Sequence, residues 1–263
     1  MSLESTIAIA SGKRMNSDFT MATYKILLFN VGYASGIQGR SVEYLTKGYR
    51  YLYQSDLLAE DVRHQMENLI AQEQPDLCCF LEVHAGSPFV GYIANHYPYF
   101  DVRSKYAPQS LLQRTPFHRG KCNAFFAKTD LNFSPDYLQN GNKKLLYEVK
   151  LESDTTVFFA HFSLHAATRQ KQFAEIAGRT KQSGSSIVCG DFNMFSGVSE
   201  LNPLLSQSNL SLTSEHQHTF PSHKPRHLLD TFLCTPDIDV RSLRVLDSVR
   251  ISDHLPVVLE FAI

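Results

Sequence analysis

The sequence predicts an α/β fold in which two β-sheets of mixed strand direction pack face to face, with helices on their outer faces: a four-layer α/β sandwich. Short apolar runs recur along the chain, some continuous and some alternating with polar residues, and helical patterns separate them in the first two-thirds. The 263 residues are 43% hydrophobic, enough for a large core. No low-complexity linker or internal repeat divides the chain, so we expect a single domain over residues 23–263.

The amino-terminal part supplies two strands around a helix. Residues 24–30 (YKILLFN) form a continuous apolar run short enough for a buried strand. Within 57–72, apolar residues recur at i, i+4, i+7 and i+8 from Val62, which places them on one helical face. Pro75 ends that helix, and the run DLCCFLE (76–82) predicts a second buried strand.

The rest of the chain continues the same alternation. A helix is predicted at 166–181, with Phe173 and Ile176 on its apolar side. Further strands are predicted at 123–128, 145–151, 156–162, 186–190, 228–234, 240–246 and 256–262.

Charge and cysteine content restrict the class of protein. The 25 basic and 26 acidic residues give a formal charge of −1, so any nucleic-acid partner must be held by a local cluster of cations and not by overall charge. The five cysteines are odd in number, lack zinc-knuckle spacing and lie mostly in apolar runs. They indicate small buried side chains in a reducing compartment, and we expect a cytoplasmic monomer.

The amino terminus is predicted to be a disordered leader over residues 1–22. Its one short apolar patch follows Glu4 and precedes basic residues, an order opposite to that of a secretory signal. No apolar stretch approaches membrane-spanning length.

Polar side chains occur where many of the predicted strands begin or end. They are Asn30, Glu82, His161, Asp191, Asn193, Asp230, Asp253 and His254. Each one alone is compatible with a structural role, such as a turn, a cap or a hydrogen-bonded core residue. Asp230 is harder to explain in this way, because it lies within the apolar run HLLDTFLC, where an unpaired carboxylate is costly to bury.

Taken together, this set of residues has a coherent chemistry. Strand ends can meet at one edge of a sheet, where open α/β sheets bind ligands. Carboxylates and carboxamides without thiolates suit Mg²⁺ or Mn²⁺ and are poor ligands for zinc. Histidines among them supply donors to a phosphoryl group and a proton carrier. With no nucleophile elbow and no glycine-rich phosphate loop, the set favours metal-assisted attack of water on a phosphate ester.

Six segments, in this order, resemble the endonuclease/exonuclease/phosphatase superfamily, which has the deoxyribonuclease I-like fold. They are FNVG (29–32), FLEV (80–83), HFSLHAATRQKQ (161–172), GDFN (190–193), TFPSHKPRHLLDTFL (219–233) and SDHLPV (252–257). The resemblance covers the chain from Tyr24 to Ile263, and GDFN and SDHLPV are the most specific of the six.

The resemblance implies a role for each matching residue. Glu82 corresponds to the principal metal-binding carboxylate, with Asn30 beside it and Asp253 close to the metal. Asp191 and Asn193 match the pair that orients and activates the attacking water. His254 matches the histidine that contacts the scissile phosphate.

Two further roles, those of Asp230 and His161, come from the same resemblance. Asp230 would hold His254 in position, and His161 would assist at the phosphate or the leaving group. Asn123 is expected to contact substrate phosphate or to cap a strand. Arg169 is expected to bind substrate or to support His161 from the following helix.

Three positions depart from the family pattern, and the first two weaken an assignment to the apurinic-site endonucleases without affecting the metal-binding set. Gly32 stands where several DNA-repair relatives have aspartate, and Leu81 where glutamine is usual. The segment KCNAFF (121–126) replaces a glycine-rich strand.

Substrate choice in this superfamily depends on loops, and the sequence leaves it open. The tyrosine-rich basic segment 33–56 suits stacked bases and phosphates, a lipid headgroup surface or a simple covering loop. The segment 104–121 offers Lys105 and Lys121 as phosphate contacts, or is a solvated loop. The histidine-rich segment 215–227 is expected to be a surface loop and not a zinc site. We therefore expect a phosphodiesterase acting on nucleic acid; a phospholipid or inositol-phosphate esterase and a non-catalytic phosphate-binding member are the alternatives.

Overall fold

The computed structural model describes residues 21–263 except 153 and 215. The predicted leader therefore lies almost wholly outside the described residues.

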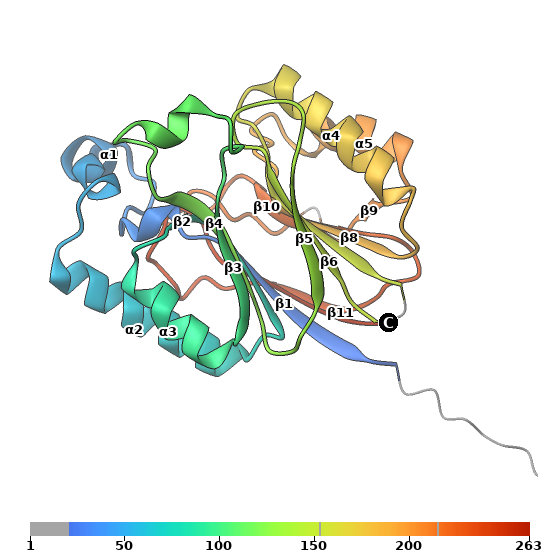
Figure 1. The fold of residues 1–263 in the computed structure, drawn as a ribbon, viewed down its shortest axis with the longest axis horizontal. Helices are drawn as coiled ribbons and strands as arrows, with labels where there is room; N and C mark the ends of the chain where they lie inside the picture. Colours follow the sequence, from blue (N-terminus) through green and yellow to red (C-terminus); the bar gives the residue numbers. More distant parts are fainter. Residues whose placement is uncertain (1–20, 153, 215) are drawn as a thin grey trace, which may run out of the picture.

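Two six-stranded sheets form the centre of the molecule (Figure 1). The first sheet has the order β11 (Asp239–Val245), β12 (Val257–Ala262), β1 (Thr23–Asn30), β2 (Leu77–His84), β4 (Lys121–Ala127), β3 (Tyr99–Ser104). The second has the order β5 (Asn132–Tyr137), β6 (Leu145–Lys150), β7 (Thr156–His161), β8 (Ser186–Asp191), β10 (Asp230–Cys234), β9 (Ser211–Leu212). The helices are α1 (Ser41–Lys47), α2 (Asp56–Glu73), α3 (Pro88–His96), α4 (Ala166–Thr180) and α5 (Asn202–Gln207).

Alternation along the strands explains the four layers. In β1, Ile26 and Leu28 pack between the sheets, whereas Leu27 and Phe29 join the cluster formed with α2 and α3. On the second sheet, the outward face packs against α4 through Phe173. Figure 1 shows α2 and α3 on one side of the sheets and α4 and α5 on the other. Because both faces of the central strands are buried, those strands are continuously apolar, as expected from the sequence.

The predicted central strands and the two predicted helices are confirmed, and the missed strands lie at the sheet edges. The helix predicted at 57–72 is α2, and that at 166–181 is α4. The prediction missed α1, α3 and α5 and the strands β3, β5 and β9. The three missed strands are all sheet-edge strands. Edge strands are more polar and tolerate residues such as Pro135, so they lack the apolar signature of a central strand.

The topology brings one end of both sheets together. Strands β1 and β2 run parallel, and so do β7 and β8, so their carboxyl ends lie at the same edge. Strand β12 is antiparallel to β1 and β10 is antiparallel to β8, so their amino ends lie there too. The polar residues predicted at the strand ends therefore all lie at one rim of the two sheets.

All five cysteines are buried and unpaired, as expected. Among the described residues, no helix has both the length and the apolarity needed to cross a membrane.

Candidate active site

A cavity of about 250 Å³ opens at this rim, between the edges of the two sheets. Seven of the eight strand-end residues line it; the eighth, Asp230, lies directly behind His254. The lining residues are Asn30, Tyr44, Glu82, Lys143, His161, Leu164, Asp191, Asn193, Phe195, Phe220, Asp253 and His254. The structure thus brings together every residue for which the sequence predicted a metal-binding or catalytic role.

Strand register in the second sheet aligns three of these side chains. His161 of β7 is paired with Asp191 of β8, and Asp191 is paired with Asp230 of β10. Nε2 of His161 lies 3.5 Å from Oδ2 of Asp191. Because cross-strand partners share a face, this row is a direct consequence of the register.

The first sheet contributes the opposite wall. Nδ2 of Asn30 donates to Oδ2 of Asp191 at 3.0 Å and lies 3.5 Å from Nε2 of His254. Nδ1 of His254 lies 2.7 Å from Oδ2 of Asp230, which also accepts a hydrogen bond from the hydroxyl of Thr219 at 2.7 Å. The Asp230 contact fixes the His254 ring and leaves Nε2 facing Asp191 at 3.9 Å.

Glu82 lies in a strongly cationic environment. Its Oε1 is 2.9 Å from Nζ of Lys105, 3.3 Å from Nζ of Lys143 and 3.8 Å from Nδ1 of His161. The hydroxyl of Tyr33 donates to the same oxygen at 3.4 Å. These contacts all reach Oε1, and none of them uses Oε2.

Two site residues adopt a left-handed backbone that non-glycine residues rarely take. Glu82 has φ of +53° and Asn193 has φ of +53°. In β2 the register with β4 shifts between Phe80 and Val83, so Glu82 lies in a bulge that turns its side chain toward the cavity. The amide of Glu82 donates to Oδ1 of Asn123 at 3.3 Å, which holds the bulge in place. Strain of this kind is typical of functional sites.

The glycine of the GDFN segment permits close packing of β7 and β8. A Cβ at Gly190 would lie 1.8 Å from the carbonyl oxygen of Ala160, so no other residue fits. Gly32, the departure noted above, has φ of +50°, and a Cβ there would lie 2.8 Å from Oγ of Ser252. At this position the left-handed backbone and the close approach of Ser252 favour glycine.

The environment of the cavity shifts the pKa values of its carboxylates in opposite directions. Burial alone would raise the pKa of Glu82, but Lys105, Lys143 and His161 outweigh it and hold that pKa well below its usual range. Burial raises the pKa of Asp191 to about 7, although the positive charge of His254 opposes this.

The two histidines differ from each other. Burial lowers the pKa of His254, but the negative charges of Asp230 and Asp191 outweigh it and raise the pKa to about 10. Burial next to Lys143 lowers the pKa of His161 well below its usual range. At neutral pH, His254 is therefore an imidazolium and His161 a neutral imidazole.

The donor set fits a hard divalent cation. Glu82 retains a carboxylate oxygen that takes no part in the lysine contacts, and Asn30 and Asp253 present further oxygens around the same cavity. Ligand atoms of Asp191, Asp230 and His254 lie within 4.8 Å of one another. However, Asp230 and His254 are already bonded to each other, so that trio suits proton handling better than chelation. Glu82, Asn30 and Asp253 remain the best candidates for metal ligands.

The two predicted substrate-binding residues lie behind the cavity. Asn123 is 1% exposed and holds the Glu82 backbone, which matches the structural alternative for this residue. Arg169 is 3% exposed and donates to the carbonyl oxygens of Ser163 and Leu164 while pairing with Glu200. It supports the segment that follows His161, and it is not placed to contact substrate, so the expectation of direct binding is corrected.

Several residues of the site were not predicted from the sequence. Lys143 lies in a polar loop before β6 with no motif to mark it. Lys105 was expected to contact phosphate or lie in a solvated loop, but it is 2% exposed and reaches Glu82 from behind. Tyr44, from the tyrosine-rich segment, donates to Oδ2 of Asp253 at 2.6 Å. Only the positions of these residues in three dimensions reveal their connection to the site.

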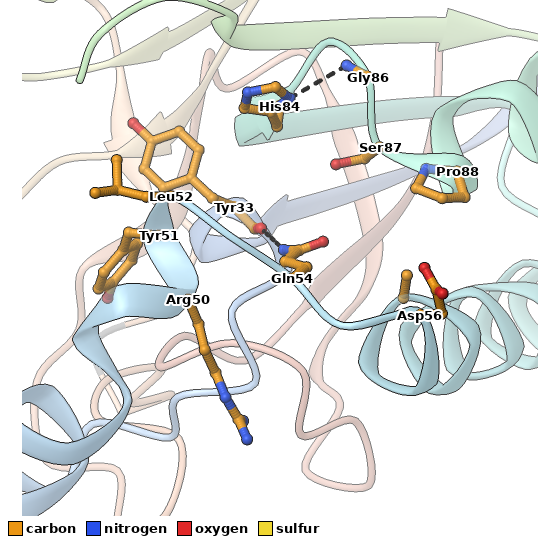
Figure 2. A pocket seen from close by; sticks show the side chains of 11 residues that line it. Tyr33, Arg50, Tyr51, Leu52, Gln54, Asp56, His84, Gly86, Ser87 and Pro88 are labelled. Carbon is orange, nitrogen blue, oxygen red and sulfur yellow. Dashed lines mark hydrogen bonds between the residues drawn. The ribbon is translucent and has the colours of Figure 1, made fainter. Parts of the chain in front are cut away.

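A second cavity of about 250 Å³ is lined in part by Tyr33, whose hydroxyl contacts Glu82 of the candidate site (Figure 2). Figure 2 shows the rings of Tyr33 and Tyr51 on one side and His84 and Ser87 on another. Its one carboxylate is Asp56. This cavity therefore lacks the cluster of carboxylates found at the candidate site, and the two cavities share none of their lining residues.

A two-sheet sandwich that gathers carboxylates, carboxamides and an Asp–His pair at one rim defines a class of metal-assisted phosphoester hydrolases. The family model described as the Endonuclease/Exonuclease/phosphatase family matches residues 28–254, and the chain belongs to this family. A search of curated proteins finds no significant match.

Solved structures share the fold at low sequence identity. The human nocturnin catalytic domain with bound sulfate is 21% identical, with 91% of this chain and 93% of that chain covered and a TM-score of 0.67. A mannosyl-6-phosphatase from Bacteroides thetaiotaomicron is 16% identical, covering 91% and 100% of the two chains, with a TM-score of 0.58. A 3′ phosphatase from Neisseria, bound to a product DNA hairpin, is 13% identical, covering 90% and 99%, with a TM-score of 0.61. These similarities establish the deoxyribonuclease I-like fold.

Proposed function

We propose that this protein is a Mg²⁺- or Mn²⁺-dependent phosphodiesterase that acts on nucleic acid by direct attack of water. The observation that carries the proposal is the meeting of Glu82, Asp191, His161 and the Asp230–His254 pair around one cavity. Membership of the family supports phosphoester hydrolysis. Among the similar structures, one is a 3′ phosphatase bound to DNA, which supports nucleic acid as the substrate.

Each residue has a separate task in the proposed reaction. Glu82, with Asn30 and Asp253, would hold the divalent cation. When bound, that cation polarises the phosphoryl oxygens and neutralises charge that develops on them. The imidazolium of His254 donates from Nε2 to a phosphoryl oxygen, and Asp230 keeps the ring oriented.

The attacking water is assigned to Asp191. Its Oδ1 accepts the backbone N–H of Asn193 at 2.9 Å, and its Oδ2 accepts Nδ2 of Asn30 at 3.0 Å, so the carboxylate is fixed at the cavity. A carboxylate with a pKa near 7 is well matched to accept a proton from water at neutral pH. His161, which is neutral, would assist the leaving group.

The test is hydrolysis of bis(p-nitrophenyl) phosphate with Mg²⁺ or Mn²⁺, with and without chelator. We expect activity that requires the metal and disappears with chelator. A panel of single-stranded DNA, RNA, sphingomyelin and inositol phosphates then assigns the substrate. Activity that persists in chelator, or none with either metal, rejects the proposed reaction and favours a non-catalytic phosphate-binding member of the family.

A further inference from the structure

Three lysine ammonium groups gather beside the proposed metal carboxylate. Lys105 and Lys143 both contact Oε1 of Glu82, at 2.9 and 3.3 Å. Nζ of Lys121 lies 4.6 Å from the centroid of the Tyr33 ring, and Nζ of Lys105 lies 4.8 Å from the same centroid. The hydroxyl of Tyr33 bonds to both Lys105 and Glu82, which makes these residues one connected cluster.

The cluster has more positive than negative charge. Among the described residues, Glu82 is the one carboxylate within 4.0 Å of any of the three ammonium groups, and it contacts Lys105 and Lys143 but not Lys121. Buried charges are retained in proteins when something compensates them. A divalent cation on Glu82 would add positive charge that Asp253 and Asp191 offset only in part, so the site favours a substrate with more negative charge than a single phosphodiester.

The three lysines differ in solvent exposure, and we assign them different roles on this basis. Lys105 is 2% exposed and reaches Glu82 from the protein interior, so it serves to position the carboxylate. Lys143 lines the cavity with its side chain 23% exposed. Lys121, at the start of β4, is half-buried and is paired in register with His84 of β2. Lys143 and Lys121 are thus the two of the three whose side chains are not fully buried.

We propose that the substrate carries a second phosphate group within one nucleotide of the scissile one, and that Lys121 and Lys143 bind it. The inference rests on the proposed function and narrows its substrate class. A nucleic acid or nucleotide with neighbouring phosphates supplies the required charge. A phosphocholine headgroup does not, because its quaternary ammonium would approach the lysines as a like charge.

The experiment compares the thymidine dinucleotide that has a single internal phosphate with the same dinucleotide bearing an added 5′- or 3′-terminal phosphate. For at least one of the phosphorylated forms, we expect kcat/KM higher by roughly tenfold or more. Lys121→Gln should reduce that preference to within about twofold, through a loss of kcat/KM on the phosphorylated form. Lys121→Arg should keep the preference, because it keeps the charge.

Lys128→Gln is the matched control. Lys128 follows the other end of β4, is exposed and lies 3.4 Å from Asp76, so its loss should leave the preference intact. Equal kcat/KM for all three dinucleotides, or the same loss of preference with Lys128→Gln, overturns the proposal.

A binding measurement separates this proposal from the proposed reaction. Calorimetry with thymidine 3′,5′-bisphosphate and thymidine 5′-monophosphate needs no turnover. If no dinucleotide is cleaved, tighter binding of the bisphosphate that is lost in Lys121→Gln still supports the second phosphate site. Equal affinity for the two nucleotides rejects it, whether or not the chain hydrolyses phosphodiesters.

Discussion

Nδ1 of His254 lies 2.7 Å from Oδ2 of Asp230, and this contact joins the two sheets of the fold. Asp230 begins β10 of the second sheet, whereas His254 precedes β12 of the first. The pair therefore serves two purposes: it holds the imidazole that we assign to the phosphate, and it compensates a carboxylate that is 1% exposed.

Replacing Asp230 should reduce activity and leave the fold intact. Asp230→Asn keeps the shape of the side chain but removes the negative charge that orients His254 and raises its pKa. We expect kcat on bis(p-nitrophenyl) phosphate to fall by about 10²–10⁴-fold while the circular dichroism spectrum stays unchanged. Asp247→Asn, at an exposed carboxylate, should retain full activity. Near-normal turnover of Asp230→Asn would remove this residue from the proposed mechanism.

Removing the Glu82 carboxylate should cost stability as well as metal binding. Glu82→Gln leaves buried Lys105 without its partner, so the metal-free protein should lose about 3–5 kcal/mol of unfolding free energy. Calorimetric Mg²⁺ binding should also disappear. In the double variant Glu82→Gln with Lys105→Met, part of the stability should return without metal binding. Unchanged urea unfolding of the single variant would show that the ion pair is unimportant.

The raised pKa of Asp191 predicts a pH-dependent gain in stability when this residue is neutralised. Its folded pKa of about 7 exceeds the ordinary value of about 3.9, so its charged form destabilises the fold progressively as pH rises between these values. In chelator, we therefore compare the free energy of unfolding of Asp191→Asn with that of wild type at each pH. This difference should favour the variant by up to about 4 kcal/mol more at pH 8 than at pH 4. Unfolding at the two pH values measures this, and the variant should be inactive. A pH-independent difference would contradict the shifted pKa.

Close packing at Gly190 predicts a purely structural defect. Gly190→Ala places a methyl group 1.8 Å from the carbonyl oxygen of Ala160, so the strands must separate and stability should fall by at least about 3 kcal/mol. Gly178→Ala is the control. Gly178 lies within α4, and a methyl group there would have no neighbouring atom within 4 Å, so alanine should raise the free energy of unfolding by about 0.5–1 kcal/mol. Thermal unfolding of both variants decides the matter, and a Gly190→Ala protein of normal stability would be inconsistent with this packing.

The central strands and the ligand set were predictable because local chemistry specifies them. Strands buried on both faces are continuously apolar, so runs such as 24–30 and 186–190 are recognisable in one dimension. A polar residue at the end of such a run is conspicuous, which is how Glu82 and Asp191 were found. The Asp230–His254 pairing came from the family resemblance, and the structure shows the contact itself.

The tertiary structure alone decided what surrounds these residues. Lys105 and Lys143 act on Glu82 across 23 and 61 positions of sequence, and no local pattern encodes a contact of that span. The left-handed backbone of Glu82 likewise depends on the bulge opposite β4 and on Asn123. The sequence by itself determined the strands, the polar groups at their ends and so the class of chemistry, because hydrophobic burial and ligand hardness are properties of residue type. Charge balance, pKa values and access to the cavity depend on distances between segments remote in the chain, and only the packed fold sets those distances.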